Sequence, residues 1–238
     1  MRRSLVRRAL VGASFLALPA LATAQTTWTN WTAASAGATG SAAGTLGGVS
    51  VSWSGALNGF QLASGTSAGG VGNINYWTPA GPYTNAGVGL TAPDRLGFLQ
   101  QNGAGSGTLT FSQAVVNPIL AFISVGQPSV PVSYSFTSAS GNPTLTLLSS
   151  NPAGNPAYWG SGSVTISGNG FEGREFSGVV QLNGTFTSIN VAFAQNEFWH
   201  GFTVGQLNAQ VVPEPSAYVL MATGLAALGA AARRRRVR

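Results

Sequence analysis

The sequence predicts an all-β protein whose main domain is an antiparallel two-sheet β-sandwich, either jelly-roll-like or immunoglobulin-like. Apolar and polar residues alternate with a period of two in many short segments, which is typical of strands with one buried face. Pairs of Gly, Asn and Pro separate these segments and mark turns. Within the body, no window before residue 216 shows a convincing apolar stripe at helical spacing with caps. We therefore expect about eight to ten short strands in two packed layers.

Residues 1–24 have the three parts of a secretory signal peptide, whose apolar part forms a helix. Four arginines, at positions 2, 3, 7 and 8, precede an apolar stretch over residues 9–21. Ala22 and Ala24 then supply the small-x-small pattern that signal peptidase requires, which makes Gln25 the first residue after cleavage. The Sec route is the expected one, and the paired arginines leave twin-arginine export as the alternative.

Residues 25–211 are expected to form the exported β-sandwich domain. The alternating segments lie at residues 49–54, 108–111, 132–137, 145–147, 164–166 and 189–193. Residues 119–125, which read ILAFISV, are continuously apolar and predict a strand buried on both faces. The Gly-, Ser- and Ala-rich residues 33–47 predict a loose loop.

The segment EFWHGFTVG, residues 197–205, contains the only histidine of the chain, His200, among aromatic neighbours. It is similar to a recurring ending of one group of exported bacterial β-sandwich proteins. The resemblance implies that this segment is the last strand of the domain, and it implies no activity.

The last segment, residues 212–238, combines a proline-rich start, an apolar run and a basic end. Residues 216–232 carry no charge and reach the lower length limit for a transmembrane helix. The arginines that follow are expected to stop transfer and to remain in the cytoplasm as residues 233–238; they are Arg233, Arg234, Arg235, Arg236 and Arg238. The body then lies on the outer side of the inner membrane. Pro213 and Pro215 keep the segment between them extended and accessible.

Together these three parts resemble the PEP-CTERM sorting signal of Gram-negative bacteria that make exopolysaccharide. The motif residues are Pro213, Glu214 and Pro215. The resemblance implies that exosortase, a membrane protease, recognises them and removes the tail. It also implies that the body is first held at the inner membrane facing the periplasm, and then reaches the cell surface or the extracellular space. A proline-rich linker before a permanent anchor is the alternative.

The net charge of +6 belongs to the two ends of the chain. Between residues 25 and 212, Arg95 and Arg174 stand against four carboxylates, so the body is slightly acidic. A nucleic-acid partner is excluded, because phosphate binding needs clustered cations on the folded domain. The absence of cysteine excludes disulfides and thiolate metal sites.

The body has too few ionisable residues for most chemistry, so a non-catalytic protein without a cofactor or metal is predicted. The alternative is a secreted polysaccharide hydrolase, which would need two facing carboxylates from Glu172, Glu175 and Glu197. Glu172 and Glu175 are instead expected to pair with Arg174 at a hairpin. A lone histidine beside aromatic residues, such as His200, is more often a packed, hydrogen-bonded residue than a catalytic base.

The predicted function is a non-catalytic protein of the cell surface or biofilm matrix that associates with exopolysaccharide. The Ser-, Thr-, Asn- and Gln-rich body suits neutral glycans, and aromatic side chains could stack on sugar rings. The candidate ligand-binding residues are Trp77, Tyr83, Trp159, Trp199 and His200. The favoured alternative is that these rings cap the ends of the sandwich. A structural role through self-association of exposed edge strands is also open.

Overall fold

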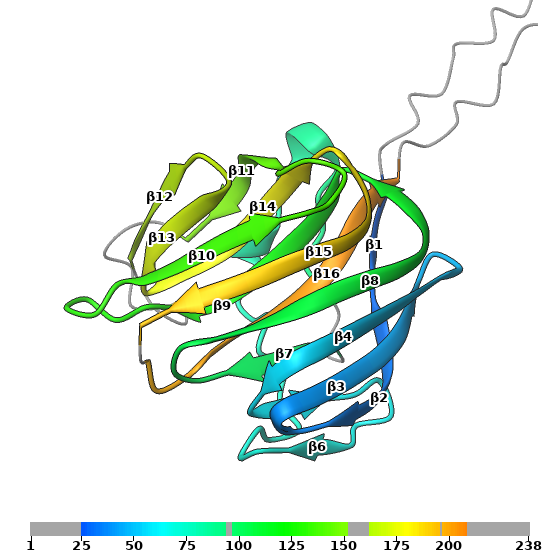
Figure 1. Cartoon of the computed structure of the whole chain (residues 1–238). Helices are drawn as coiled ribbons and strands as arrows, with labels where there is room; N and C mark the ends of the chain where they lie inside the picture. The colour runs from blue at the N-terminus through cyan, green and yellow to red at the C-terminus, as the bar shows by residue number, and fades with distance from the viewer. Residues whose placement is uncertain (1–24, 94–96, 152–161, 196, 209–238) are drawn as a thin grey trace, which may run out of the picture. The chain divides into compact units, whose positions relative to one another are not determined.

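The computed structural model describes residues 25–93, 97–151, 162–195 and 197–208 (Figure 1). The predicted signal peptide, the sorting tail with its transmembrane segment, and Trp159 lie outside the described residues. Across the described ranges, the structure contains no helix with the length and apolar character to cross a membrane.

The described residues form two antiparallel eight-stranded sheets, which confirms the predicted all-β sandwich. Sheet A has the order β11 (Thr144–Ser150), β14 (Phe176–Asn183), β9 (Pro118–Val125), β16 (His200–Asn208), β7 (Phe98–Gln101), β5 (Gly59–Gln61) and β6 (Ser67–Ala68), with β1 (Gln25–Trp28) paired to β16. Sheet B has the order β12 (Ser163–Ser167), β13 (Gly170–Arg174), β10 (Val132–Thr137), β15 (Thr185–Ala194), β8 (Gly105–Val116), β4 (Val49–Leu57), β3 (Gly37–Leu46) and β2 (Asn30–Ser35). Two short 3-10 helices, Gly81–Tyr83 and Ala86–Val88, lie between β6 and β7.

Successive strands in the second half of the domain cross from one sheet to the other. β8 of sheet B leads to β9 of sheet A, and β13, β14, β15 and β16 alternate between the sheets. In an immunoglobulin-like sandwich, half of the consecutive strands (A–B, D–E and F–G) pair within one sheet. The crossing connectivity therefore agrees with the jelly-roll-like form of the prediction.

The tightest crossings are single-residue corners with a positive φ. Asn117 joins β8 to β9 with φ 49°, and Gly184 joins β14 to β15 with φ 144°. The two corners bond to each other, because Asn117 N donates to Gly184 O at 2.7 Å and Gly184 N donates to Asn117 Oδ1 at 2.9 Å. Asparagine and glycine tolerate this backbone better than other residues, and such bends are how strands switch sheets.

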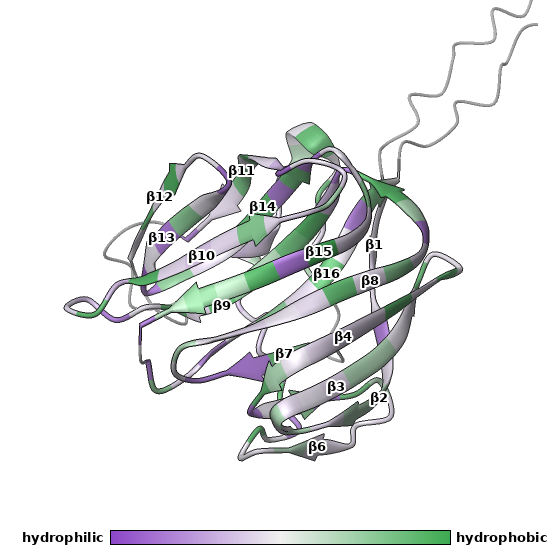
Figure 2. Ribbon diagram, in the orientation of Figure 1, coloured by the Kyte–Doolittle hydropathy of each residue, from purple (hydrophilic) through white to green (hydrophobic). Residues whose placement is uncertain are grey.

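The inward residues of the two sheets form the main core. Green and pale bands alternate along β4, β8 and β15 in Figure 2, as expected for strands with one buried face. β9 differs because it is buried along almost its whole length, as the ILAFISV segment predicted. Its second face lies under the segment between β6 and β7, where Tyr76, Trp77 and Tyr83 cluster with Ile119 and Ile123.

The predicted loose loop over residues 33–47 is wrong, because β2 and β3 occupy most of it as a paired edge of sheet B. Along β3 the inward residues Gly40, Ala42, Gly44 and Leu46 are buried and alternate with exposed ones. Three of these four are too small to produce a hydropathic alternation. They are small because the backbones come close: a Cβ at Gly44 would collide with the carbonyl of Asn30. The sandwich accordingly has more strands than the sequence suggested.

Candidate functional site

Three of the aromatic residues predicted as ligand contacts, Trp77, Tyr83 and Trp199, belong to the cluster on the outer face of sheet A. Trp77 and Tyr83 are 1% and 2% exposed, and their ring centroids lie 5.1 Å apart in an edge-on contact. Trp199 is partly buried and stacks on Phe98 at 5.3 Å. None of these three rings forms an open platform. Trp159 lies outside the described residues, so its part in ligand binding stays a prediction.

His200 points to the opposite face of sheet A, into the core between the sheets. Its side chain is fully buried, and its ring meets the rings of Tyr134 and Phe193 edge-on at 5.6 and 5.9 Å. Gln101 is its cross-strand partner on β7. The histidine is therefore a packed residue, as the aromatic context favoured, and it is separated from Trp199 by the sheet.

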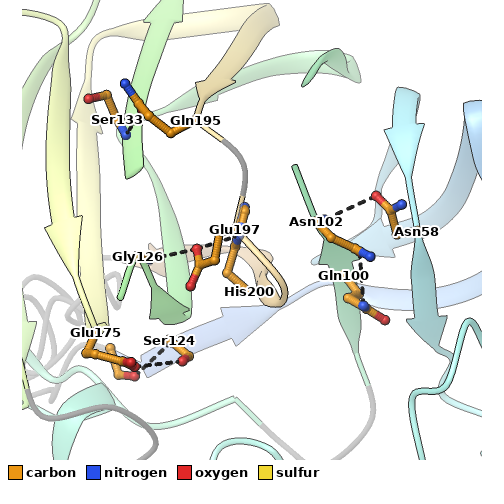
Figure 3. A network of polar contacts seen from close by, with 11 residues as sticks. Asn58, Gln100, Asn102, Ser124, Gly126, Ser133, Glu175, Gln195, Glu197 and His200 are labelled. Atoms are coloured by element: carbon orange, nitrogen blue, oxygen red, sulfur yellow. Dashed lines mark hydrogen bonds and ion pairs between the residues drawn. The ribbon is translucent and has the colours of Figure 1, made fainter. Parts of the chain in front are cut away.

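A buried carboxylate lies against this histidine at one end of the sandwich (Figure 3). Glu197 Oε2 lies 2.9 Å from His200 Nδ1, an ion-pair distance at which the ring N–H is not aligned as a hydrogen bond. The same oxygen accepts from Gly126 N at 2.7 Å. The backbone of Glu197 is held as well, because its carbonyl accepts from Gly103 N at 2.8 Å. Glu197 thus ties β16 to two loops that lie far from it in sequence.

Glu197 contributes to a raised pKa at two neighbouring residues. Burial raises the pKa of Tyr134 well above its ordinary value, and the nearby Glu197 carboxylate raises it further, so this tyrosine stays neutral. Burial also raises the pKa of Glu175, and Glu197 adds to that rise while the hydrogen bond from Ser124 opposes it. Ser124 Oγ donates to Glu175 Oε2 at 3.1 Å.

Unusual backbone conformations gather at the same end. Among the described residues, four other than glycine have positive φ, and three of them are here: Ser124 at 51°, Glu175 at 53° and Gln195 at 72°. Gln195 follows β15, and its Oε1 accepts from Ser133 N at 3.1 Å (Figure 3). Left-handed backbone at non-glycine residues often accompanies function, since other contacts must hold it in place.

The three glutamates considered for hydrolysis lie in different environments. Glu172 lies exposed on the outer face of sheet B and pairs with Arg174 at 3.4 Å, as predicted. Glu175 differs from the prediction: it turns the corner between β13 and β14, which is a crossing between sheets and not a hairpin, and it bonds Ser124. Glu175 and Glu197 are thus the two carboxylates that come near each other.

The loop between β15 and β16 presents one residue that sequence reasoning did not single out. Phe198 is 81% exposed, although Glu197 before it is buried and Trp199 after it is partly buried. All other aromatic residues in the described ranges are buried or partly buried. The composition of the EFWH segment did not distinguish its exposed ring from its packed ones, because only the fold decides which one faces out.

The outer face of sheet B carries two hollows lined mainly by small polar residues. One, of about 400 Å³, is lined by Ser133, Tyr134, Ser135, Thr165, Ser167, Asn169, Gly170, Phe171 and Glu172. The other, of about 260 Å³, is lined by Ser106, Gly107, Thr108, Ser135, Thr137, Asn190, Val191 and Ala192. Glu172 is the one charged residue in either lining. Within the ranges that the structure describes, His, Asp and Glu side chains form no group of three that could hold a metal ion.

Comparison with known families matches one segment, residues 211–236, to the PEP-CTERM protein-sorting motif. The comparisons with curated proteins and with solved structures give no match. The matched segment contains Pro213, Glu214 and Pro215, the predicted transmembrane run and Arg233–Arg236. The family implies processing by exosortase and export toward the surface. By this motif the chain is identified as a protein that carries the PEP-CTERM sorting signal.

Proposed function

We propose that this is a non-catalytic exported protein that reaches the cell surface or extracellular matrix through its PEP-CTERM signal and associates there with a neutral exopolysaccharide. The observation that carries the proposal is the sorting motif at residues 211–236. It directs the body to a compartment in which polysaccharide is the abundant partner. The composition of the body suits such a partner, because its residues are rich in hydroxyls and amides and poor in charge.

The outer face of sheet B supports the second half of the proposal. Ser54, Thr108, Asn190 and Thr137 form one row across four paired strands. Neighbouring strands lie about 4.8 Å apart, so such a row offers a hydrogen-bonding group at nearly regular intervals. Hydroxyls and amides both donate and accept, which matches the hydroxyls of a neutral sugar. An acidic polysaccharide would find almost no cation on this face.

Sorting is tested by the mass of the mature protein. In the native host, the wild-type chain is expected to lose the residues beyond the Pro-Glu-Pro segment. The triple variant P213A/E214A/P215A is expected to keep its C-terminus and remain with the inner membrane. S52A, a change on the exposed face of β4, serves as the matched control. A wild-type protein whose mass includes Arg238 contradicts processing.

Polysaccharide association is tested by pull-down of the exported protein with exopolysaccharide purified from its host. An acidic polysaccharide of similar length is the comparison. Retention by the host polysaccharide, with little dependence on salt, supports the proposal. No retention by either polymer removes the glycan part of it.

Hydrolysis of that polysaccharide is the second candidate. One observation favours it: Glu175 and Glu197 interact electrostatically and the pKa of Glu175 is raised, as for one partner of a catalytic carboxyl pair. Release of reducing ends distinguishes hydrolysis from non-catalytic association. It is assayed singly in the variants E172Q, E175Q, E197Q and H200A. Equal rates in all four variants and wild type exclude these residues from catalysis.

A further inference from the structure

Phe198 is an aromatic side chain held out in solvent by a segment that is fixed on both sides. Exposing 81% of a phenylalanine ring leaves apolar surface in water, which is unfavourable unless a ligand covers it. Single exposed apolar residues are common on proteins, so exposure alone is not a site. What distinguishes Phe198 is how firmly its base is held.

Contacts with two other loops and the burial of His200 hold that base. Glu197, directly before Phe198, binds Gly126 through its carboxylate and Gly103 through its carbonyl. Two residues after Phe198, His200 is fully buried and begins β16. An aromatic ring with few rotatable bonds on such a base loses little conformational entropy on binding.

The 400 Å³ hollow on sheet B begins next to this segment. Ser133, which lines the hollow, donates its backbone N–H to Gln195 Oε1 at 3.1 Å. Phe198 is three residues beyond Gln195, so their Cα atoms are separated by no more than about 11 Å. A chain of two or three sugar units spans that length. The hollow and the segment that carries Phe198 are therefore close enough for one oligosaccharide to contact both.

The hollow also offers the groups that a sugar needs for orientation. Thr165 and Ser167 present hydroxyls, and Glu172 presents an acceptor carboxylate for neighbouring sugar hydroxyls. Arg174 fixes this carboxylate at 3.4 Å and also donates to Pro128 O at 3.1 Å, which joins it to the loop after β9.

We propose that Phe198 and the hollow over β10, β12 and β13 form a glycan-binding site. The face of a pyranose ring stacks on Phe198, and the next units of the chain lie in the hollow with hydrogen bonds to Thr165, Ser167 and Glu172. This inference rests on the proposed association with neutral exopolysaccharide and names the surface that performs it.

Affinity electrophoresis with the host exopolysaccharide tests the site, using exported protein purified from the host. F198A is expected to raise the Kd about tenfold, as for a central aromatic contact, while F198W keeps the affinity. E172Q and T165A are expected to weaken binding by smaller factors. The matched control is V116A, which removes a 54% exposed side chain at the opposite end of β8. Because Phe198 is exposed, F198A is expected to keep the wild-type melting temperature.

The outcomes separate the site from the proposed function. If wild type does not bind the polysaccharide, the proposed association fails and the site with it. If wild type binds and F198A binds equally well, the association stands and the site is wrong. If F198A leaves the Kd unchanged but lowers the mass measured by sedimentation, Phe198 contacts a second copy of the chain, which also overturns the site.

Discussion

At the scale of single residues, Glu197 organises one end of the sandwich. Its carboxylate is buried, lies beside His200 and accepts a backbone N–H from Gly126. A buried carboxylate is tolerated only when such partners replace its hydration. The same contacts fix the segment that presents Phe198, so the stability of this end and the exposure of the ring depend on one residue.

E197A is expected to lower the free energy of unfolding by about 2 kcal/mol or more, since it leaves the Gly126 N–H and His200 without their buried partner. Urea denaturation measures the change. E197Q, which keeps an acceptor oxygen in place, should lose less than E197A. Equal stability of E197A and wild type would show that the contacts of Glu197 contribute nothing to the fold.

Glu175 predicts a dependence of stability on pH. Burial, with a further contribution from the charge of Glu197, raises its folded-state pKa above the ordinary value of 4.5, so the ionised form is disfavoured in the fold. Its ionisation therefore lowers stability as pH rises through and above 4.5, and protonation relieves this effect as pH falls. E175Q is neutral and keeps an acceptor for Ser124. We expect E175Q to exceed wild type in stability at pH 7 and to converge with it below pH 4.5.

Urea denaturation at pH 4 and pH 7 measures this difference. E172Q, on the exposed face of β13, is the matched control. A gap between E175Q and wild type that widens toward acid pH would contradict the assignment.

The residue-level predictions from sequence succeeded where local context was sufficient. Aromatic neighbours favoured a packed His200, and the structure buries it against Tyr134 and Phe193. The role of Glu197 was not predictable, because its partner Gly126 is 71 positions away in sequence. The exposure of Phe198 was equally hidden, since Phe198 lies in the loop before β16, where strand alternation does not decide which side chain faces the core.

At the scale of elements, hydropathy reveals a strand only when its inward residues are large. β9 was predicted because its residues are apolar on both faces apart from Ser124. β3 was missed because its inward residues include Gly40, Ala42 and Gly44. The close approach of two backbones demands these small residues, and it removes the signal by which the strand could be recognised.

G44A is expected to destabilise the domain by about 1–3 kcal/mol, because the added methyl group would meet the backbone of Asn30 on β2. Thermal unfolding followed by circular dichroism measures the loss. A43S changes the neighbouring residue, which is exposed on the outer face of the same strand, and should leave the melting temperature almost unchanged. If both variants melt together, β2 and β3 are not packed as described.

At the scale of the whole molecule, most charged residues lie in the predicted leader and tail, outside the described β-sandwich. The described residues contain Arg174, Glu172, Glu175, Glu197 and His200 as their ionisable acids and bases other than tyrosine, whereas the predicted leader and tail carry nine arginines. The sequence alone showed this separation, and the absence of a nucleic-acid partner stays a prediction. The fold is therefore held by apolar packing and hydrogen bonds.

The melting temperature of the exported protein should consequently change by less than about 2 °C between 20 and 200 mM NaCl. The exposed Glu172–Arg174 pair contributes little in water, and the Glu197–His200 pair is shielded from ions by burial. Differential scanning calorimetry measures the shift. A change of several degrees would mean that charges outside the described residues interact with the sandwich.

Sheet A can be completed only after the last strand, β16, has been synthesised. This last strand lies inside sheet A, with β9 on one side and both β7 and β1 on the other. The first strand, β1, therefore has no pairing partner in the sheet until β16 is in place. Only three residues after it, the sorting motif begins. A polypeptide whose synthesis ends before β16 lacks both the strand that joins the parts of sheet A and the sorting motif. A product truncated before β16 would keep the predicted N-terminal signal for export, but it could not complete sheet A. It would also lack the motif that implies sorting to the surface.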